Sequence, residues 1–67
     1  MNQEFWRKIT YIEREISDAG YDPYAQLTAY IRTGDTRYIT RRGNARQLIL
    51  ELDTTVLADY LMQKLPE

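Results

Sequence analysis

Apolar residues recur in the first part of the chain at the spacing of one helix face. Successive apolar positions are separated by four, three, four and three residues, which matches the 3.6-residue period of an amphipathic α-helix. The positions are Phe5, Ile9, Ile12, Ile16 and Ala19. Gly20 follows them, and a glycine in the left-handed conformation commonly ends a helix. We therefore predict a helix over residues 3–19.

A second helix is predicted from residue 23 because boundary signals stand at both of its ends. Asp22 can accept a backbone N–H as the N-cap, and Pro23 lacks the N–H that would go unpaired in the first turn. Gly34 is a second candidate for a C-terminal glycine. The apolar face of this helix consists of Tyr24, Leu27, Tyr30 and Ile31.

The segment after Gly34 has room only for a short helical turn. Asp35 is a candidate cap for this turn, which we place over residues 36–40. The residues Arg41, Arg42 and Gly43 do not readily continue it. We predict a connection there.

Two more helices complete the predicted fold. Asn44 is the candidate N-cap of a helix from Ala45 to about Leu52, and Asp53 is the candidate N-cap of a helix over residues 54–64, closed by Pro66. Their inward positions are Ala45, Leu48, Ile49, Leu52, Val56, Leu57, Tyr60, Leu61 and Leu65. No segment alternates apolar and polar residues as a strand does. The prediction is one all-α domain over residues 1–67, with four longer helices and one short turn.

The small size of the domain favours association with a second copy. A chain of this length buries only about 60% of its unfolded surface, and the six tyrosines suit both interfaces and shallow cores. We predict a homodimer. The candidate contacts are Trp6, Tyr24, Tyr30 and Tyr38, and each of them can instead belong to the core of the monomer.

The composition leaves little room for catalysis. The chain has no cysteine and no histidine, which excludes disulfides, thiolate or imidazole metal ligands and Ser/His or Cys/His nucleophilic sites. Glu15 and Asp18 lie on neighbouring helical turns, but a solvated helix face explains them. We expect no enzyme activity, no metal and no cofactor. No apolar run approaches the length of a membrane span, so a cytoplasmic location is expected.

Charge is unevenly distributed although the formal net charge is only −1. Residues 1–22 have a net charge of −2 and residues 47–67 a net charge of −3, whereas residues 23–46 have a net charge of +4. The candidate partner-binding residues in this basic segment are Arg37, Arg41, Arg42 and Arg46. Three interpretations compete: pairing with acidic helices of the same chain or a second subunit, docking of an acidic partner protein, and binding of nucleic acid.

Arg46 stands at an unfavourable place for a cation. It follows the candidate N-cap Asn44, and the positive end of the helix dipole disfavours positive charge in the first turn. We therefore expect Arg46 to have a specific acceptor, such as a carboxylate or a carbonyl across an interface.

Several short motifs of the chain resemble one family in a single register. They are Gly20-Tyr21-Asp22-Pro23, Gln26-Leu27, Tyr30-Ile31, Gly34-Asp35, Tyr38-Ile39-Thr40, Asn44-Ala45-Arg46 and Leu48-Ile49. This run resembles the IreB family of small regulatory phosphoproteins of Gram-positive bacteria. The resemblance covers about residues 9–63.

The resemblance implies a compact, all-helical, homodimeric protein that regulates without catalysing a reaction. It implies action downstream of a membrane Ser/Thr kinase in the control of cell-wall synthesis. The implied route is Clp-protease turnover of UDP-N-acetylglucosamine 1-carboxyvinyltransferase. The family pattern also has a phosphorylated threonine in a tail before the first helix. Here the first threonine, Thr10, falls inside the predicted helix, and Thr36 replaces a proline of the pattern, so we assign no phosphorylation site.

Overall fold

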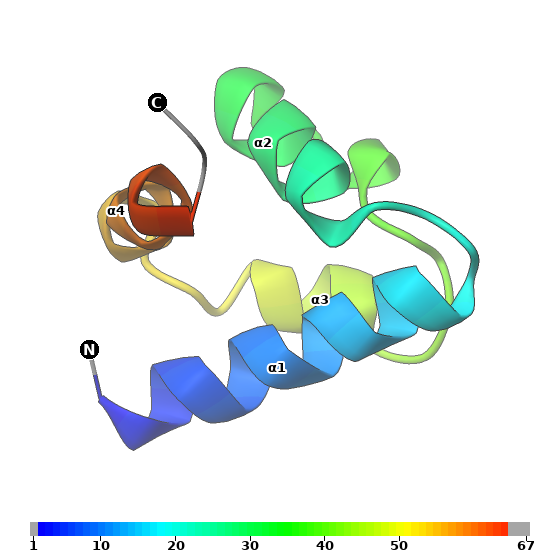
Figure 1. Ribbon diagram of the computed structural model, residues 1–67, viewed down its shortest axis with the longest axis horizontal. Helices are drawn as coiled ribbons and strands as arrows, with labels where there is room; N and C mark the ends of the chain where they lie inside the picture. The colour runs from blue at the N-terminus through cyan, green and yellow to red at the C-terminus, as the bar shows by residue number, and fades with distance from the viewer. Residues whose placement is uncertain (1, 65–67) are drawn as a thin grey trace.

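The computed structural model describes residues 2–64, and every regular element in that range is helical (Figure 1). The elements are α1 (Gln3–Asp18), α2 (Pro23–Thr33), the 3₁₀ turn η1 (Thr36–Tyr38), α3 (Ala45–Ile49) and α4 (Thr54–Lys64). The predicted all-α fold is confirmed. The predicted inward position of Leu65 and the helix end at Pro66 lie outside the described residues.

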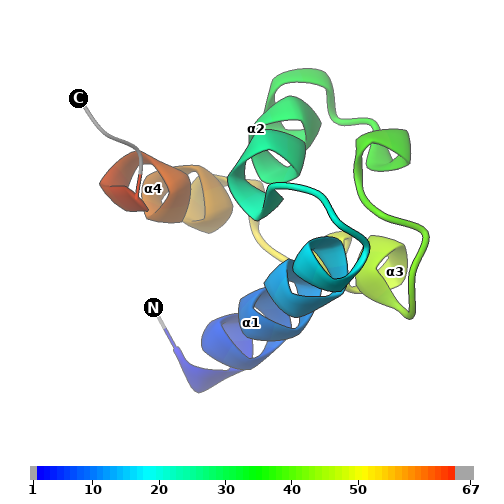
Figure 2. The same cartoon turned by 45° about the vertical axis from the view of Figure 1, so that its right-hand side comes forward.

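The longest helix, α1, organises the packing. It contacts α2 and α3, and α2 in turn contacts α4 and η1. Figures 1 and 2 show α3 alongside α1, with α2 and α4 on the other side of the molecule. In both views η1 and the connection into α3 lie at the end of the molecule away from the beginning of α1.

The apolar stripe of α1 forms the centre of the core. Ile9, Ile12 and Ile16 have no exposed surface, and burial of each stabilises the fold by about 1.5–3 kcal/mol relative to exposure. The other buried apolar residues are Phe5, Leu27, Tyr30, Ile39, Ala45, Ile49, Leu52, Leu57, Tyr60 and Leu61. Ala19, a predicted member of the stripe, is half-buried at the helix end.

Aspartates are the N-cap residues of three helical elements, α2, η1 and α4. Each accepts a hydrogen bond from the backbone N–H two residues later: Asp22 from Tyr24 at 3.0 Å, Asp35 from Arg37 at 2.9 Å, and Asp53 from Thr55 at 2.8 Å. Pro23 occupies the first position of α2. Asn2 caps α1 in the same way, through a 2.9 Å bond from the N–H of Phe5, and the sequence reasoning did not identify it.

Two glycines end helices in the left-handed conformation. Gly20 has a φ of +90°, and Gly34, with a φ of +72°, donates its N–H to the carbonyl of Tyr30. Only glycine adopts such angles without steric cost. The two residues therefore set the lengths of α1 and α2.

The third α-helix begins at Ala45, as predicted, but its capping and its C-terminal end differ from the prediction. Asn44 stands at the N-cap position, but its side chain makes no capping hydrogen bond within the described part of the chain. The helix ends at Ile49, where it was expected to reach about Leu52. Beyond it the N–H groups of Glu51 and Leu52 bond to carbonyls three residues earlier. These tighter turns replace the last α-helical turn while Leu52 stays buried.

Tyr60 connects α4 to α1 through its ring and its hydroxyl. The ring contacts Phe5 and Trp6 edge to face, with centroids 5.5 and 5.6 Å away, and the hydroxyl donates to Glu13 Oε2 at 2.6 Å. Burial, and then the hydrogen bond to Glu13, raise the pKa of Tyr60 above its usual value.

We expect the free energy of unfolding to fall above about pH 10 because of Tyr60. The unfolded tyrosine loses its proton near pH 10, whereas the folded one keeps it, so this contribution is complete below pH 10 and declines by up to about 1.4 kcal/mol per pH unit above it. Urea unfolding from pH 8 to 11 measures the effect. The same alkaline slope in Tyr60→Phe would contradict the prediction.

Candidate functional site

The end of the molecule that carries η1 contains an open hollow of about 340 Å³. It is bordered by the beginning of α2, by η1, by the connection into α3 and by the first turn of α3. The lining residues are Tyr21, Gln26, Arg37, Tyr38, Ile39, Thr40, Arg41, Arg42 and Arg46. All four candidate partner-binding arginines are among them, and no acidic residue is. We call this feature the arginine-lined hollow.

The backbone under the hollow is anchored to the core. Ile39 is 1% exposed, and Thr40 is also buried. The N–H of Thr40 donates to Gln26 Oε1 of α2 at 2.8 Å, and the N–H of Arg42 donates to Thr40 Oγ1 at 3.2 Å. The connection therefore carries Arg41 between two residues whose backbone N–H groups are hydrogen-bonded.

Arg46 has the specific acceptors that its position in the helix required. Its Nε donates to the carbonyl of Ile39 at 2.8 Å, and its Nη2 donates to the carbonyl of Arg37 at 3.3 Å. These carbonyls belong to the same chain, so a second subunit is not needed to supply them. The side chain is half-buried and ties the first turn of α3 to η1.

Arg37 is paired with its neighbour Asp35. The guanidinium Nε and Nη2 donate to the two carboxylate oxygens at distances between 2.7 and 3.1 Å. The hydrogen bonds from Arg37 lower the pKa of Asp35, and the same pair raises the pKa of Arg37. Because the Arg37 side chain is 84% exposed, solvent screens this pair and it adds little stability.

Arg42 is linked to α1. Its Nε lies 3.1 Å from Glu15 Oε2, and the N–H of Asn44 donates to Tyr11 Oη at 3.1 Å. Gly43 lies between these two contacts with a φ of +59°, facing the Tyr11 hydroxyl and the Glu15 carboxylate. The connection thus passes close to α1 at a point where a side chain has no room.

Arg41 differs from the other three arginines. It is exposed, and within residues 2–64 its side chain has no ion pair or hydrogen bond. Of the four arginines around the hollow, Arg41 is therefore the one whose guanidinium is fully available to a partner.

Comparison with known proteins identifies the family. Residues 1–65 match the family model described as IreB regulatory phosphoprotein. This chain belongs to the IreB family. It is also 38% identical, over 47 residues, to a UPF0297 protein of Lachnoclostridium phytofermentans. The match covers 70% of this chain and 53% of the relative, so it spans about half the length of that protein.

The aromatic candidates of this IreB-family chain do not form one surface. Tyr30 is 5% exposed and therefore belongs to the interior of the monomer. Tyr24 is partly buried and packs against the core. Trp6 and Tyr38 are 44% and 49% exposed. They lie on the beginning of α1 and on η1, which Figure 1 places at opposite ends of the molecule.

Sequence reasoning missed the residues that position the arginines. Gln26, Tyr11 and Glu15 contact the connection from α2 and α1, and Tyr21 adds a 62% exposed ring to the hollow. Gln26 and Tyr21 lie within the motifs on which the resemblance to the IreB family was based. No pattern along the chain pointed to Tyr11. Pairing of the arginines with an acidic helix of the same chain was one of the open interpretations, and Arg42 makes such a pair with Glu15 of α1.

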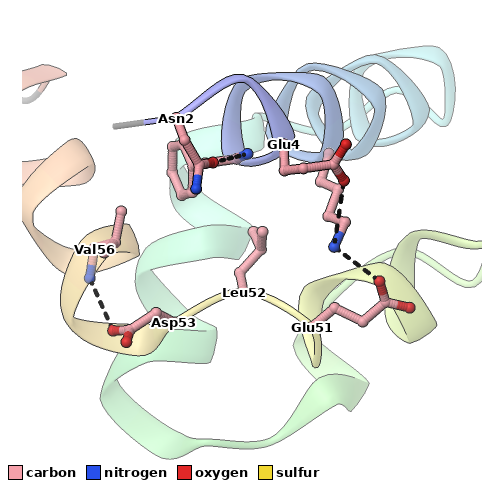
Figure 3. Close-up of a pocket in the computed structure, with 8 residues that line it drawn as sticks. Asn2, Glu4, Glu51, Leu52, Asp53 and Val56 are labelled. Carbon is pink, nitrogen blue, oxygen red and sulfur yellow. Dashed lines mark hydrogen bonds and ion pairs between the residues drawn. The ribbon is translucent and has the colours of Figure 1, made fainter.

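A second hollow, of about 400 Å³, lies between the beginning of α1 and the connection from α3 to α4 (Figure 3). Phe5, Leu52 and Val56 form its apolar part. Lys8 lies 3.0 Å from Glu51 and 3.9 Å from Glu4 across it. The cation here is already paired with carboxylates, unlike Arg41.

Proposed function

We propose that this IreB-family protein regulates without catalysis, by docking an acidic segment of a partner protein against the arginine-lined hollow. The family description as regulatory phosphoproteins supports a regulatory role. The observation that carries the docking proposal is the exposed Arg41 among three further arginines. Among residues 2–64, Arg41 has no partner and no carboxylate lines the hollow. Arginine suits this task because its planar fork binds carboxylates through two parallel hydrogen bonds.

The family resemblance supplies the proposed partners. We place the protein in the cytoplasm, downstream of a Ser/Thr kinase. There it would control Clp-dependent turnover of UDP-N-acetylglucosamine 1-carboxyvinyltransferase and so cell-wall synthesis. Clp components and the carboxyvinyltransferase are the partners to test. Within residues 2–64, no helix has both the length and the apolar character of a membrane span.

The variant Arg41→Glu is expected to lose partner binding without losing stability. It reverses the charge of an exposed side chain that makes no hydrogen bond or ion pair with the described residues. Affinity for the captured partner should fall at least about tenfold, as expected when like charges meet at an interface. The measurement is capture from native lysate read by mass spectrometry, followed by titration with purified Clp components and carboxyvinyltransferase.

The control is Arg7→Glu, which makes the same change to a side chain that is 74% exposed and lies near the beginning of α1. Arg7 pairs with Glu4 at 3.3 Å, but both side chains are largely exposed, so solvent screens the pair and its loss costs little stability. Equal binding by wild type and Arg41→Glu would refute the docking proposal. Arg42→Glu is unsuitable, because it places a second carboxylate beside Glu15 and disturbs the connection itself.

We also propose that the protein acts as a homodimer. Support comes from the family resemblance and from Trp6, whose ring remains 44% exposed beside the buried Phe5 and Tyr60. If folding and association are coupled, the melting temperature should fall over about a hundredfold dilution. A melting temperature that does not change with concentration would show that the monomer is sufficient.

Nucleic acid is the second candidate ligand. Tyr21 and Tyr38 are exposed beside the arginines, and aromatic rings next to positive charge are typical of single-strand binding. Retention of arbitrary oligonucleotides, with steep loss of affinity as salt rises, would favour this function over protein docking.

A further inference from the structure

The arginine-lined hollow has more positive charge than the chain itself neutralises. Two of its four arginines pair with the carboxylates of Asp35 and Glu15. Arg41 and Arg46 have no carboxylate within 4 Å in the described part of the chain. The hollow is therefore suited to an occupant with about two negative charges, which is the charge that a phosphoryl group carries near pH 7.

The hydrogen-bond donors of the hollow also suit a phosphoryl group. Arg46 is held in place by the carbonyls of Ile39 and Arg37 and still has unused N–H groups. None of the guanidinium N–H groups of Arg41 donates to a residue in the range 2–64. A phosphoryl group offers three acceptor oxygens, whereas the carboxylate of an aspartate or glutamate offers two and only one charge.

The backbone of the hollow and the Arg46 side chain are already held in place in the free protein. Thr40 is bonded to Gln26, and Ile39 is buried, so the backbone that presents Arg41 is fixed before binding. Arg46 is fixed by its own two hydrogen bonds. Of the two donors, the Arg41 side chain alone remains to be ordered on binding, so the loss of conformational entropy is smaller than for a site in which both must be ordered.

We propose that the arginine-lined hollow binds a phosphorylated side chain on a segment of the partner protein, with Arg41 and Arg46 as the donors. This inference rests on the proposed function, because it states the chemistry of the acidic segment that docks there. Tyr21 and Tyr38, exposed at the hollow, provide contact surface for the residues on either side of the phosphoryl group.

A protein segment fits the charge distribution better than a nucleic acid does. The basic residues surround one hollow of about 340 Å³, whereas a nucleic-acid strand needs positive charge along a groove that follows its backbone. The flanking parts of the chain, residues 1–22 and 47–67, are net negative. They disfavour a long polyanion and tolerate a single phosphoryl group.

The test uses degenerate peptides immobilised on beads, with a central phosphoserine, phosphothreonine or phosphotyrosine. Matched libraries carry glutamate or the unmodified residue at that position. The wild-type protein should be retained by the phosphorylated libraries with at least about tenfold higher affinity than by the glutamate library. Arg41→Glu should lose this retention, and Arg7→Glu should keep it.

Each alternative result overturns a defined part of the argument. Equal retention by glutamate and phosphorylated peptides overturns the phosphoryl inference and leaves docking of an acidic partner intact. Another outcome is that no library retains the protein while capture of the partner from lysate still depends on Arg41. That result too overturns the phosphoryl inference and leaves docking of an acidic partner intact. If neither assay depends on Arg41, the proposed function falls as well. Displacement of bound phosphopeptide by a single-stranded oligonucleotide at lower concentration would assign the hollow to nucleic acid.

Discussion

Replacing Gly43 by alanine is expected to lower the free energy of unfolding by about 2–5 kcal/mol. The left-handed backbone conformation costs a residue with a Cβ about 1–2 kcal/mol, and forcing atoms into a filled space costs about 1–3 kcal/mol. At Gly43 both costs apply, because φ is +59° and a Cβ would collide with the Tyr11 hydroxyl and lie 3.0 Å from Glu15 Oε2. Thermal unfolding should show a melting temperature lower by more than about 8 °C.

Alanine substitutions at two other glycines measure the cost of the left-handed backbone without the cost of a collision. Gly20 and Gly34 have positive φ angles, but a Cβ at either one would meet no atom within 4 Å. Alanine at these positions should therefore cost about 1–2 kcal/mol. Tyr11→Phe should recover part of the loss in Gly43→Ala by removing the colliding oxygen. Equal losses at Gly43 and Gly34 would show that Tyr11 does not restrict this position.

The variant Ile39→Ala is expected to lose about 2–5 kcal/mol of stability, the usual cost of truncating a buried isoleucine. Ile39 is 1% exposed and follows η1 directly. Its carbonyl also accepts the bond from Arg46 Nε. The substitution should therefore loosen the connection that carries Arg41 as well as leaving a cavity. Urea unfolding measures the stability, and titration with the captured partner measures the effect on binding.

Leu50→Ala is the matched control for Ile39→Ala. Leu50 is an aliphatic residue of similar size next to α3, but it is 66% exposed. Its truncation should change stability by no more than about 0.5 kcal/mol. Similar losses in the two variants would mean that Ile39 does not anchor the connection.

Helix boundaries were predictable because they depend on neighbouring residues. Asp22, Pro23 and Gly34 act through the backbone within a few positions of themselves, and α2 begins and ends where they stand. Asn44 and the end of α3 show the limit of such reasoning. The backbone N–H of Asn44 bonds to Tyr11 of α1, a contact that capping preferences do not contain.

The sequence predicted the positive charge of the arginine cluster, but not the contacts of most of its arginines. Residues 23–46 are the one basic part of an acidic chain, which drew attention to the correct segment. The sequence set Arg46 apart through its place in a first helical turn, but it left the roles of Arg37, Arg41 and Arg42 equivalent. The structure separates them: Arg46 bonds to backbone carbonyls, Arg42 to Glu15, Arg37 to Asp35, and Arg41 remains free within the described residues.

The four candidate aromatic residues show what composition can predict and what requires the folded structure. Composition identified Trp6, Tyr24, Tyr30 and Tyr38 as residues for a core or an interface, and could not divide them. Burial depends on which elements cover a side chain. Tyr30 is covered in the folded monomer, and Tyr38 is not.

The sequence by itself determined the all-α class, the apolar face of α1, most helix ends and the basic character of residues 23–46. These follow from interactions within one or two helical turns. Only the tertiary structure decided which arginines pair with a carboxylate, which side chains a Cβ at Gly43 would collide with, and how Gln26 holds the connection. Those properties depend on contacts between residues far apart in the chain, and such contacts exist only once the helices have packed.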